Sequence, residues 1–297
     1  MNNEKIKVLI TGSTGLLGRA LVKIFQKSGF HVLATGYSRA TPPIIKLDLT
    51  DEEAVSTFLY STKADIIIHA AAERKPDICE NNQTQTLSIN LNATSHLATL
   101  AKKINARFFF ISTDYVFNGN QAPYDENSDT EPLNFYGKTK EQAEKAILAI
   151  SEQHTIIRVP VLYGDVLTLN ESAITTIAQQ IINGGSSTHD NWAIRYPTHV
   201  DDIALTLCDL SNLPAKQTSG IFHISNHQPM TKFDIARCVV DMPELNQKFI
   251  VADDNPSQDA SRPYNCALKD TRLSTLGICH QRDFKEAFIK ILKIYVN

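Results

Sequence analysis

The first half of the chain alternates short apolar segments with helical patterns. Runs rich in β-branched and aromatic residues predict strands at 7–11, 31–35, 65–70, 107–112 and 155–159, and the patterns between them predict helices at 16–27, 52–60, 83–104 and 135–150. Asp51 has the position of an N-cap for the second helix. Strands that alternate with helices in this way form a parallel sheet with helices on both faces. We therefore expect an α/β fold with a doubly wound parallel sheet.

Composition argues against several classes of protein. The chain has 29 basic and 32 acidic residues and a formal charge of −3, without a block of like charges, so neither nucleic acid nor an anionic membrane is an expected partner. No apolar stretch approaches the roughly 20 residues that span a bilayer. Five widely spaced cysteines and nine histidines show no metal-ligand spacing. We expect a cytoplasmic protein with reduced thiols and no metal site.

Three glycines follow the first predicted strand. Gly12, Gly15 and Gly18 precede or open a helix that contains Leu16 and Leu17. In such a turn the glycines let the backbone approach a pyrophosphate, and the helix N-terminus offers unpaired N–H groups and partial positive charge. The pattern predicts a Rossmann dinucleotide-binding turn; a glycine cluster that only allows helix packing is the alternative.

The end of the second predicted strand bears on the choice of dinucleotide. In NAD-binding proteins of this fold an Asp or Glu there binds the ribose hydroxyls. This chain has Tyr37, Ser38 and Arg39 after Gly36, so the acid is missing and an arginine is present. We predict NADP, whose 2′-phosphate Arg39 would bind, with NAD as the second option. A solvent-facing Arg39 without a ligand is the alternative.

Tyr136 and Lys140 lie four residues apart near the start of the predicted helix 135–150, and therefore share a face. A cation near a phenol lowers the pKa of the tyrosine and makes it a proton donor and acceptor near neutral pH. Thr113, just after the fourth predicted strand, has a hydroxyl that can hold a substrate oxygen. The same spacing is common on protein surfaces, but in this position it indicates a catalytic set of Thr113, Tyr136 and Lys140.

The second half of the chain is less regular. After Arg158 the pattern becomes irregular, with Gly184, Gly185 and a serine-rich turn; a helix is predicted at 200–210, a strand near 221–224 and an amphipathic helix at 283–295. We expect an NADP-binding Rossmann domain over 1–160 with a return segment at about 199–225. Residues 161–198 and 226–297 would form a smaller, partly interleaved C-terminal lobe that binds substrate or a partner.

Together these features resemble the extended short-chain dehydrogenase/reductases. Within that class the segments STDYVFNG at 112–119, PLNFYGKTK at 132–140 and RPYNCALKD at 262–270 are similar to the dTDP-4-dehydrorhamnose reductase group. The resemblance implies an oxidoreductase of dTDP-rhamnose biosynthesis that uses NADPH to reduce a nucleotide-linked 4-keto-6-deoxy sugar at C4. Tyr136 would protonate the new alkoxide, Lys140 would support Tyr136 and the cofactor ribose, and Thr113 would orient the carbonyl.

The same resemblance implies most of the cofactor contacts, and two further residues are candidates for binding the substrate. The cofactor set comprises Gly12, Thr14, Gly15, Leu16, Leu17, Gly18, Tyr37, Ser38, Arg39, Asp48, Leu49, Ala70, Ala71, Ala72, Arg74, Tyr136, Lys140 and Leu162. For the substrate, Trp192 precedes a loop with Arg195, Pro197 and His199 that can hold a base or a phosphate. Arg262 can pair with a diphosphate in bidentate fashion. A core-packed tryptophan and an intramolecular ion pair are the respective alternatives.

A regulatory branch of the same group offers a second interpretation. The segments HAAAERKPDICEN at 69–81, LNESA at 169–173, DNWAIRYPTHVDDIA at 190–204 and MTKFDIA at 230–236 resemble the regulatory β subunits of methionine adenosyltransferase. This resemblance implies an NADP-binding protein with little or no catalysis, whose partner is the methionine adenosyltransferase catalytic subunit. A homodimer is a further option. An epimerase or dehydratase is less favoured, because no Glu lies beside Thr113.

Overall fold

The computed structural model describes residues 5–184, 186–245, 248–255 and 261–296. Its largest element is a seven-stranded sheet in the order β10-β6-β5-β4-β1-β2-β3, in which all neighbours are parallel. The strands are β1 (Lys7–Thr11), β2 (His31–Gly36), β3 (Ile45–Lys46), β4 (Ile66–His69), β5 (Arg107–Thr113), β6 (Thr155–Val159) and β10 (Gly220–His223). The doubly wound α/β fold is thus confirmed.

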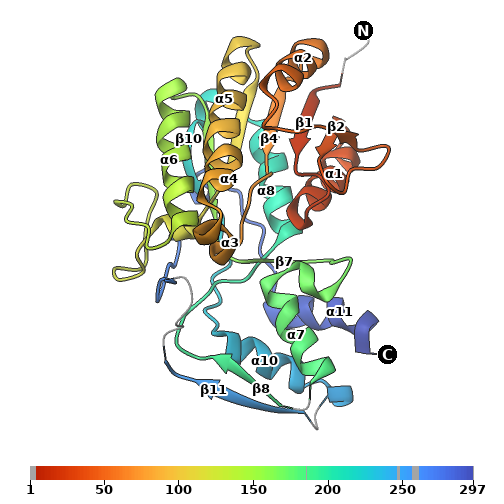
Figure 1. Ribbon diagram of the computed structural model, residues 1–297, viewed down its shortest axis with the longest axis vertical. Helices are drawn as coiled ribbons and strands as arrows, with labels where there is room; N and C mark the ends of the chain where they lie inside the picture. The colour runs from red at the N-terminus through yellow and green to blue at the C-terminus, as the bar shows by residue number, and fades with distance from the viewer. Residues whose placement is uncertain (1–4, 185, 246–247, 256–260, 297) are drawn as a thin grey trace.

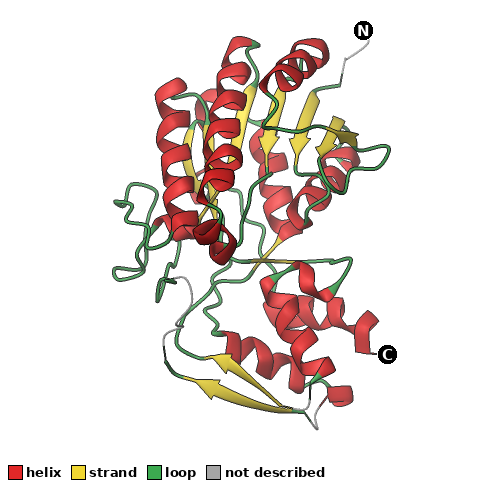
Figure 2. Cartoon of the chain, in the orientation of Figure 1, coloured by secondary structure: helices red, strands yellow, loops and turns green. Residues whose placement is uncertain are grey.

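Helices cover both faces of this sheet (Figures 1 and 2). Successive side chains of a strand point to opposite faces, so Val8 and Ile10 pack with α1 and α8, whereas Leu9 packs with α2, α5 and α6. Asp51 caps α2 by accepting a hydrogen bond from the Ala54 N–H, as predicted. These helices are α1 (Leu16–Lys27), α2 (Glu52–Thr62), α5 (Ala93–Lys103), α6 (Phe135–Ile150) and α8 (Val200–Asn212).

The predicted helix at 83–104 is not a regular α-helix. It consists of α4 (Gln83–Leu87), a π-helical turn (Ser88–Asn92) and α5, and it is preceded by α3 (Pro76–Asn81), which was not predicted. The buried side chain of Asn90 in the π-helical turn accepts a hydrogen bond from the Glu73 N–H (2.9 Å) and donates one to the Glu73 carbonyl (2.9 Å). The irregular turn therefore fixes the loop after β4.

A smaller lobe lies below the sheet in Figure 1. Its helices α7 (Ala173–Asn183), α10 (Lys232–Val240) and α11 (Phe284–Val296) share an apolar core, and β8 (Ser186–Asp190) pairs in parallel with β11 (Phe249–Asp253). α7 was not predicted and lies in the stretch where the sequence pattern is irregular. β7 (Leu162–Tyr163) pairs with β9 (Thr198–His199) between the two lobes. Short helices are α9 (Ala215–Thr218) and single 3-10 turns at Asp114–Val116, Leu169–Glu171, Pro243–Leu245 and Ser274–Leu276.

Two general features bear on function. In the described part of the chain no helix is long and apolar enough to span a bilayer. All five cysteines are free, and only Cys279 is exposed.

Candidate functional site

The turn between β1 and α1 has the backbone geometry that its glycines predict. Gly12 has a φ of +70°, and a Cβ there would lie 2.8 Å from the Ala71 nitrogen. A Cβ at Gly18 would lie 2.1 Å from the Gly12 carbonyl oxygen. Gly15 precedes α1 without a capping side chain, so the first N–H groups of the helix are available to an anion. This close-packed turn fits a dinucleotide pyrophosphate.

The next predicted cofactor residues follow β2 and β3, which are neighbouring strands of the sheet. Tyr37, Ser38 and Arg39 are exposed directly after β2. Asp48 accepts hydrogen bonds from the Thr50 hydroxyl (2.7 Å) and the Thr50 N–H (2.9 Å), which hold the pKa of Asp48 below its usual range. Leu49 is buried beneath this surface.

The loop after β4 approaches the same turn. The Ala71 N–H lies 3.4 Å from the Thr11 hydroxyl, and Ala70, Ala71 and Ala72 are partly buried. Arg74, at the end of this loop, donates to the backbone carbonyl of Glu171 (2.6 Å). Leu162 of β7 packs on the core cluster that contains α1. Most of the predicted cofactor residues thus belong to loops and helix starts at the carboxyl edge of the parallel sheet, where ligands bind in doubly wound folds.

Glu171 is a charged residue of this region that sequence reasoning did not single out. Its carboxylate binds Arg19 of α1 in bidentate fashion (2.6 and 2.7 Å) and contacts Arg39 at 3.4 Å. Nothing in the spacing of these residues along the chain indicates that they meet, because Glu171 belongs to the smaller lobe.

The three predicted catalytic residues lie together. Thr113 ends β5 and Tyr136 lies in the first turn of α6, and the Thr113 hydroxyl is close enough to Tyr136 to act on its pKa. The Asn134 side chain caps α6 through the Gly137 N–H (2.9 Å) and so fixes the helix that carries Tyr136 and Lys140. The ammonium of Lys140 donates to the Ile111 carbonyl (2.6 Å) and lies 3.9 Å from the centre of the Phe110 ring.

The charges of this set differ from expectation. Burial lowers the pKa of Lys140 to about 7, although the Glu144 carboxylate acts in the opposite direction. Burial also raises the pKa of Tyr136, so the expected lowering by Lys140 is absent from this structure. Burial of the phenol is the largest cause of this shift, and the Lys140 ammonium is instead hydrogen-bonded to the Ile111 carbonyl on β5. Stabilisation of phenolate therefore requires a change in the surroundings of this pair, such as a bound ligand.

A buried ion pair lies one helical turn beyond Lys140. Glu144 binds Arg158 of β6 at 2.7 Å, both side chains are 3% exposed, and the Ser112 hydroxyl donates to Glu144. Arg158 in turn approaches His223 of β10 at 3.4 Å. This pair joins α6 to β5, β6 and β10 and so holds the catalytic helix against the sheet.

The two predicted substrate residues lie near each other but are engaged within the protein. Trp192 packs against Tyr264 with ring centres 5.0 Å apart. Arg262 binds Asp77 of α3 at 3.0 Å, the intramolecular ion pair that was the alternative to diphosphate binding.

Arg195, which sequence reasoning left in a general loop assignment, is a further buried cation. It is 6% exposed, donates to the carbonyls of Ile194 (2.9 Å) and Pro263 (3.1 Å), and lies 5.8 Å from the Tyr115 ring centre. Its Nη2 atom is buried and has no hydrogen-bond partner in the described part of the chain. Burial raises the pKa of nearby Asp114 to about 7, while Arg195 opposes that shift.

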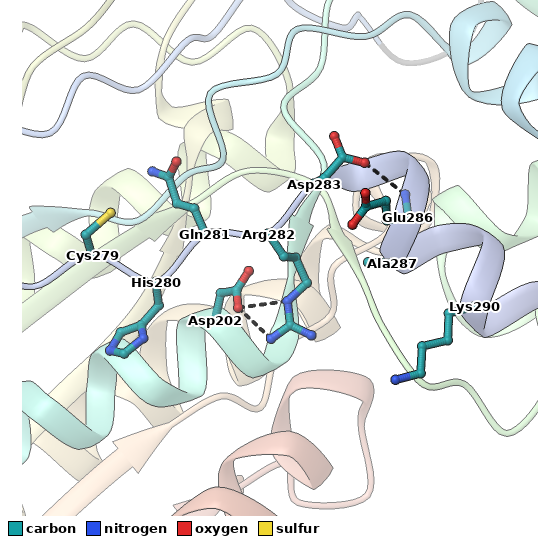
Figure 3. Close-up of a pocket in the computed structure, with 9 residues that line it drawn as sticks. All are labelled: Asp202, Cys279, His280, Gln281, Arg282, Asp283, Glu286, Ala287 and Lys290. Carbon is teal, nitrogen blue, oxygen red and sulfur yellow. Dashed lines mark hydrogen bonds and ion pairs between the residues drawn. The ribbon is translucent and has the colours of Figure 1, made fainter.

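A surface hollow of about 440 Å³ lies elsewhere, beside α8 and α11 (Figure 3). Arg282 pairs with Asp202 there through two hydrogen bonds of 2.9 and 2.6 Å. No predicted site residue lines this hollow, so we do not assign the chemistry to it. Its lining consists of Asp202, Cys279, His280, Gln281, Arg282, Asp283, Glu286, Ala287 and Lys290.

The sheet order and the glycine turn define a nucleotide-binding protein of the Rossmann type. A model of the RmlD substrate binding domain family matches residues 6–297, and the chain therefore belongs to that family. The family resemblance inferred from the sequence is confirmed.

Known relatives include both a methionine adenosyltransferase subunit and sugar-nucleotide reductases. Methionine adenosyltransferase 2 subunit beta from Bos taurus is 40% identical over 291 residues, which are 96% of this chain and 86% of the relative. A dTDP-4-dehydrorhamnose reductase from Aggregatibacter actinomycetemcomitans is 28% identical over 98% of this chain and 99% of its own length. The crystal structure of a Bacillus anthracis dTDP-4-dehydrorhamnose reductase in complex with NADP has the same fold, with a TM-score of 0.84, 24% identity and coverage of 98% and 100% of the two chains.

Proposed function

We propose that this protein is an NADPH-dependent reductase of a nucleotide-linked 4-keto-6-deoxy sugar, of the dTDP-4-dehydrorhamnose type. The observation that carries the proposal is the convergence of Thr113, Tyr136 and Lys140 at the carboxyl edge of the sheet, beside a turn that fits a dinucleotide. A family that includes sugar-nucleotide reductases supports it.

NADP is the proposed cofactor, and its reduced nicotinamide supplies a hydride. Gly12, Gly15 and Gly18 would hold the pyrophosphate at the start of α1. Arg39 would pair with the 2′-phosphate, since no acid that could bind the ribose hydroxyls directly follows β2. Further contacts with the dinucleotide would come from the loop after β3, which contains Asp48, and from the loop after β4, which contains Arg74.

Tyr136 donates the proton that the substrate oxygen requires after reduction. Its phenol lies close enough to Thr113 for the Thr113 hydroxyl to act on its pKa, so the two hydroxyls could hold one carbonyl oxygen between them. Lys140 is bound to the Ile111 carbonyl, and it would have to turn toward Tyr136 for its charge to favour phenolate after proton donation.

The substrate side of the site is proposed to recognise an anionic group. Arg195 is buried with an unpaired Nη2 atom, and an unpaired buried donor of this kind is costly unless a ligand accepts from it. Arg262 and the Trp192–Tyr264 pair lie on the same side, with Pro263 between the two arginines. A nucleotide diphosphate fits this set of side chains in charge and type.

The test is NADPH oxidation at roughly 340 nm by the purified protein, with and without dTDP-4-dehydrorhamnose. Tyr136→Phe should reduce kcat by about 100-fold or more, because removal of a general acid typically costs that much. Tyr60→Phe, at an exposed position of α2, is the matched control and should retain full activity. Absence of substrate-dependent oxidation by the wild-type protein would exclude the reductase.

A second function is favoured by the identity of 40% to a methionine adenosyltransferase β subunit. In this alternative the chain binds NADP and regulates a methionine adenosyltransferase catalytic subunit, with little or no turnover of its own. Tight NADP binding without sugar reduction, together with co-purification of that catalytic subunit, would support it. Sugar reduction without any such association would decide for the enzyme.

A further inference from the structure

Glu171 lies where the two lobes meet, directly beside the proposed cofactor residues. In Figure 1 the loop before α7 lies below α1. The Glu171 side chain is only 7% exposed, and its carboxylate is held by Arg19 (2.6 and 2.7 Å) and by the Leu167 N–H (3.0 Å). Arg19 is itself fixed by the Thr14 carbonyl at 3.0 Å. The negative charge therefore has a defined position next to the glycine turn.

Arg39 is the weakest partner of this carboxylate. Its guanidinium approaches Glu171 Oε1 at 3.4 Å, whereas Arg19 binds the same atom at 2.6 Å. The Arg39 side chain is 57% exposed, so it can leave Glu171 at little cost. A phosphate is a stronger and bidentate acceptor for arginine. Arg39 thus has two candidate acceptors, one within the protein and one on the proposed cofactor.

We propose that Glu171 determines cofactor selectivity by competing with the 2′-phosphate of NADP for Arg39. The inference rests on the proposed function, since it assumes that NADP binds at this turn. Glu171 disfavours the phosphorylated dinucleotide in two ways: it engages Arg39 before binding, and its charge repels the phosphate dianion afterwards. NAD lacks this phosphate and is unaffected by either. Glu171 therefore lowers the preference for NADP over NAD.

The experiment measures the dissociation constants of NADP and NAD by isothermal titration calorimetry for the wild-type protein, Glu171→Gln, Arg39→Ala and the double variant. We expect Glu171→Gln to raise the preference for NADP over NAD by roughly three- to fivefold, the effect of one partly exposed charge pair. This effect requires Arg39. In the Arg39→Ala background, Glu171→Gln should therefore change the preference for NADP over NAD by less than about twofold.

Asp202→Asn is the matched control, because Asp202 is a buried carboxylate bound through two hydrogen bonds to Arg282 (Figure 3), and neither residue is among the predicted cofactor residues. It should leave the NADP to NAD ratio unchanged, which separates selectivity from general loosening of the structure. An unchanged or lowered ratio in Glu171→Gln would overturn the inference, as would the same increase in both Arg39 backgrounds. If the wild-type protein binds neither dinucleotide, the proposed function fails and the inference fails with it.

Discussion

His69 joins the two strands from which the cofactor loops begin. Its ring nitrogens contact the Thr11 hydroxyl (2.7 Å) at the end of β1 and the Thr94 hydroxyl (2.9 Å) on α5, and its ring stacks on Phe110 at 5.9 Å. Burial and, to a smaller extent, the charge of Lys140 lower the pKa of His69 to about 3. The neutral ring is therefore part of the structure that supports Gly12 and Ala70.

This neutral histidine predicts a dependence of stability on pH. Its pKa is about 3 in the folded state and near its ordinary value of about 6.5 in the unfolded state. Between these values the unfolded state binds more protons, so the free energy of unfolding falls as pH falls below about 6.5, by about 1.4 kcal/mol per pH unit from this residue. Urea denaturation of His69→Gln from pH 6.5 to 4.5 should show a correspondingly shallower fall than the wild type.

The exposed His31 provides the control for that measurement. His31→Gln should retain the wild-type slope, because its side chain is accessible to solvent in both states. Equal slopes for the wild type and His69→Gln would show that His69 is not held neutral in the folded protein.

At the scale of elements, the turn between β1 and α1 is the part of the site with the least tolerance for change. A Cβ at Gly18 would lie 2.1 Å from the Gly12 oxygen, so Gly18→Ala must open the turn. We expect at least roughly a tenfold loss of NADP affinity, because the N–H groups that face the pyrophosphate are displaced. Calorimetric titration of the folded variant with NADP measures this loss.

Gly29→Ala separates affinity from stability. Gly29 has a φ of +89°, and no atom lies within 4 Å of its ideal Cβ, so alanine there is strained without contacting the turn. It should lower the free energy of unfolding by about 1 kcal/mol and leave NADP affinity unchanged. Similar loss of affinity in both variants would mean that stability, and not the turn geometry, controls binding.

The elements also show what the sequence could predict. The long apolar strands, the glycine turn and the start of α6 have strong local signals, and the structure has them in the predicted places. α7 was missed because Ile174, Ile177 and Ile181 are β-branched and have weak helix propensity; packing in the smaller lobe stabilises the helix instead. The contact between Glu171 and Arg19 joins residues 152 positions apart, which no local pattern can show.

At the scale of the whole molecule, the two lobes are connected by several independent contacts. Leu16 of α1 packs on both the sheet core and the core of the smaller lobe, and Glu171 bonds back to Arg19. Arg282 before α11 binds Asp202 of α8. Polar and apolar contacts both join the two lobes, and we therefore expect the two lobes to unfold in one transition.

Differential scanning calorimetry with and without NADP tests this cooperativity. A ligand that binds only the folded state at about 100 times its dissociation constant stabilises that state by about 2.7 kcal/mol. For a chain of this size the midpoint should rise by roughly 5 °C, and because the lobes are coupled a single transition should move as a whole. Two transitions, of which only one moved with NADP, would show that the smaller lobe unfolds independently of the cofactor site.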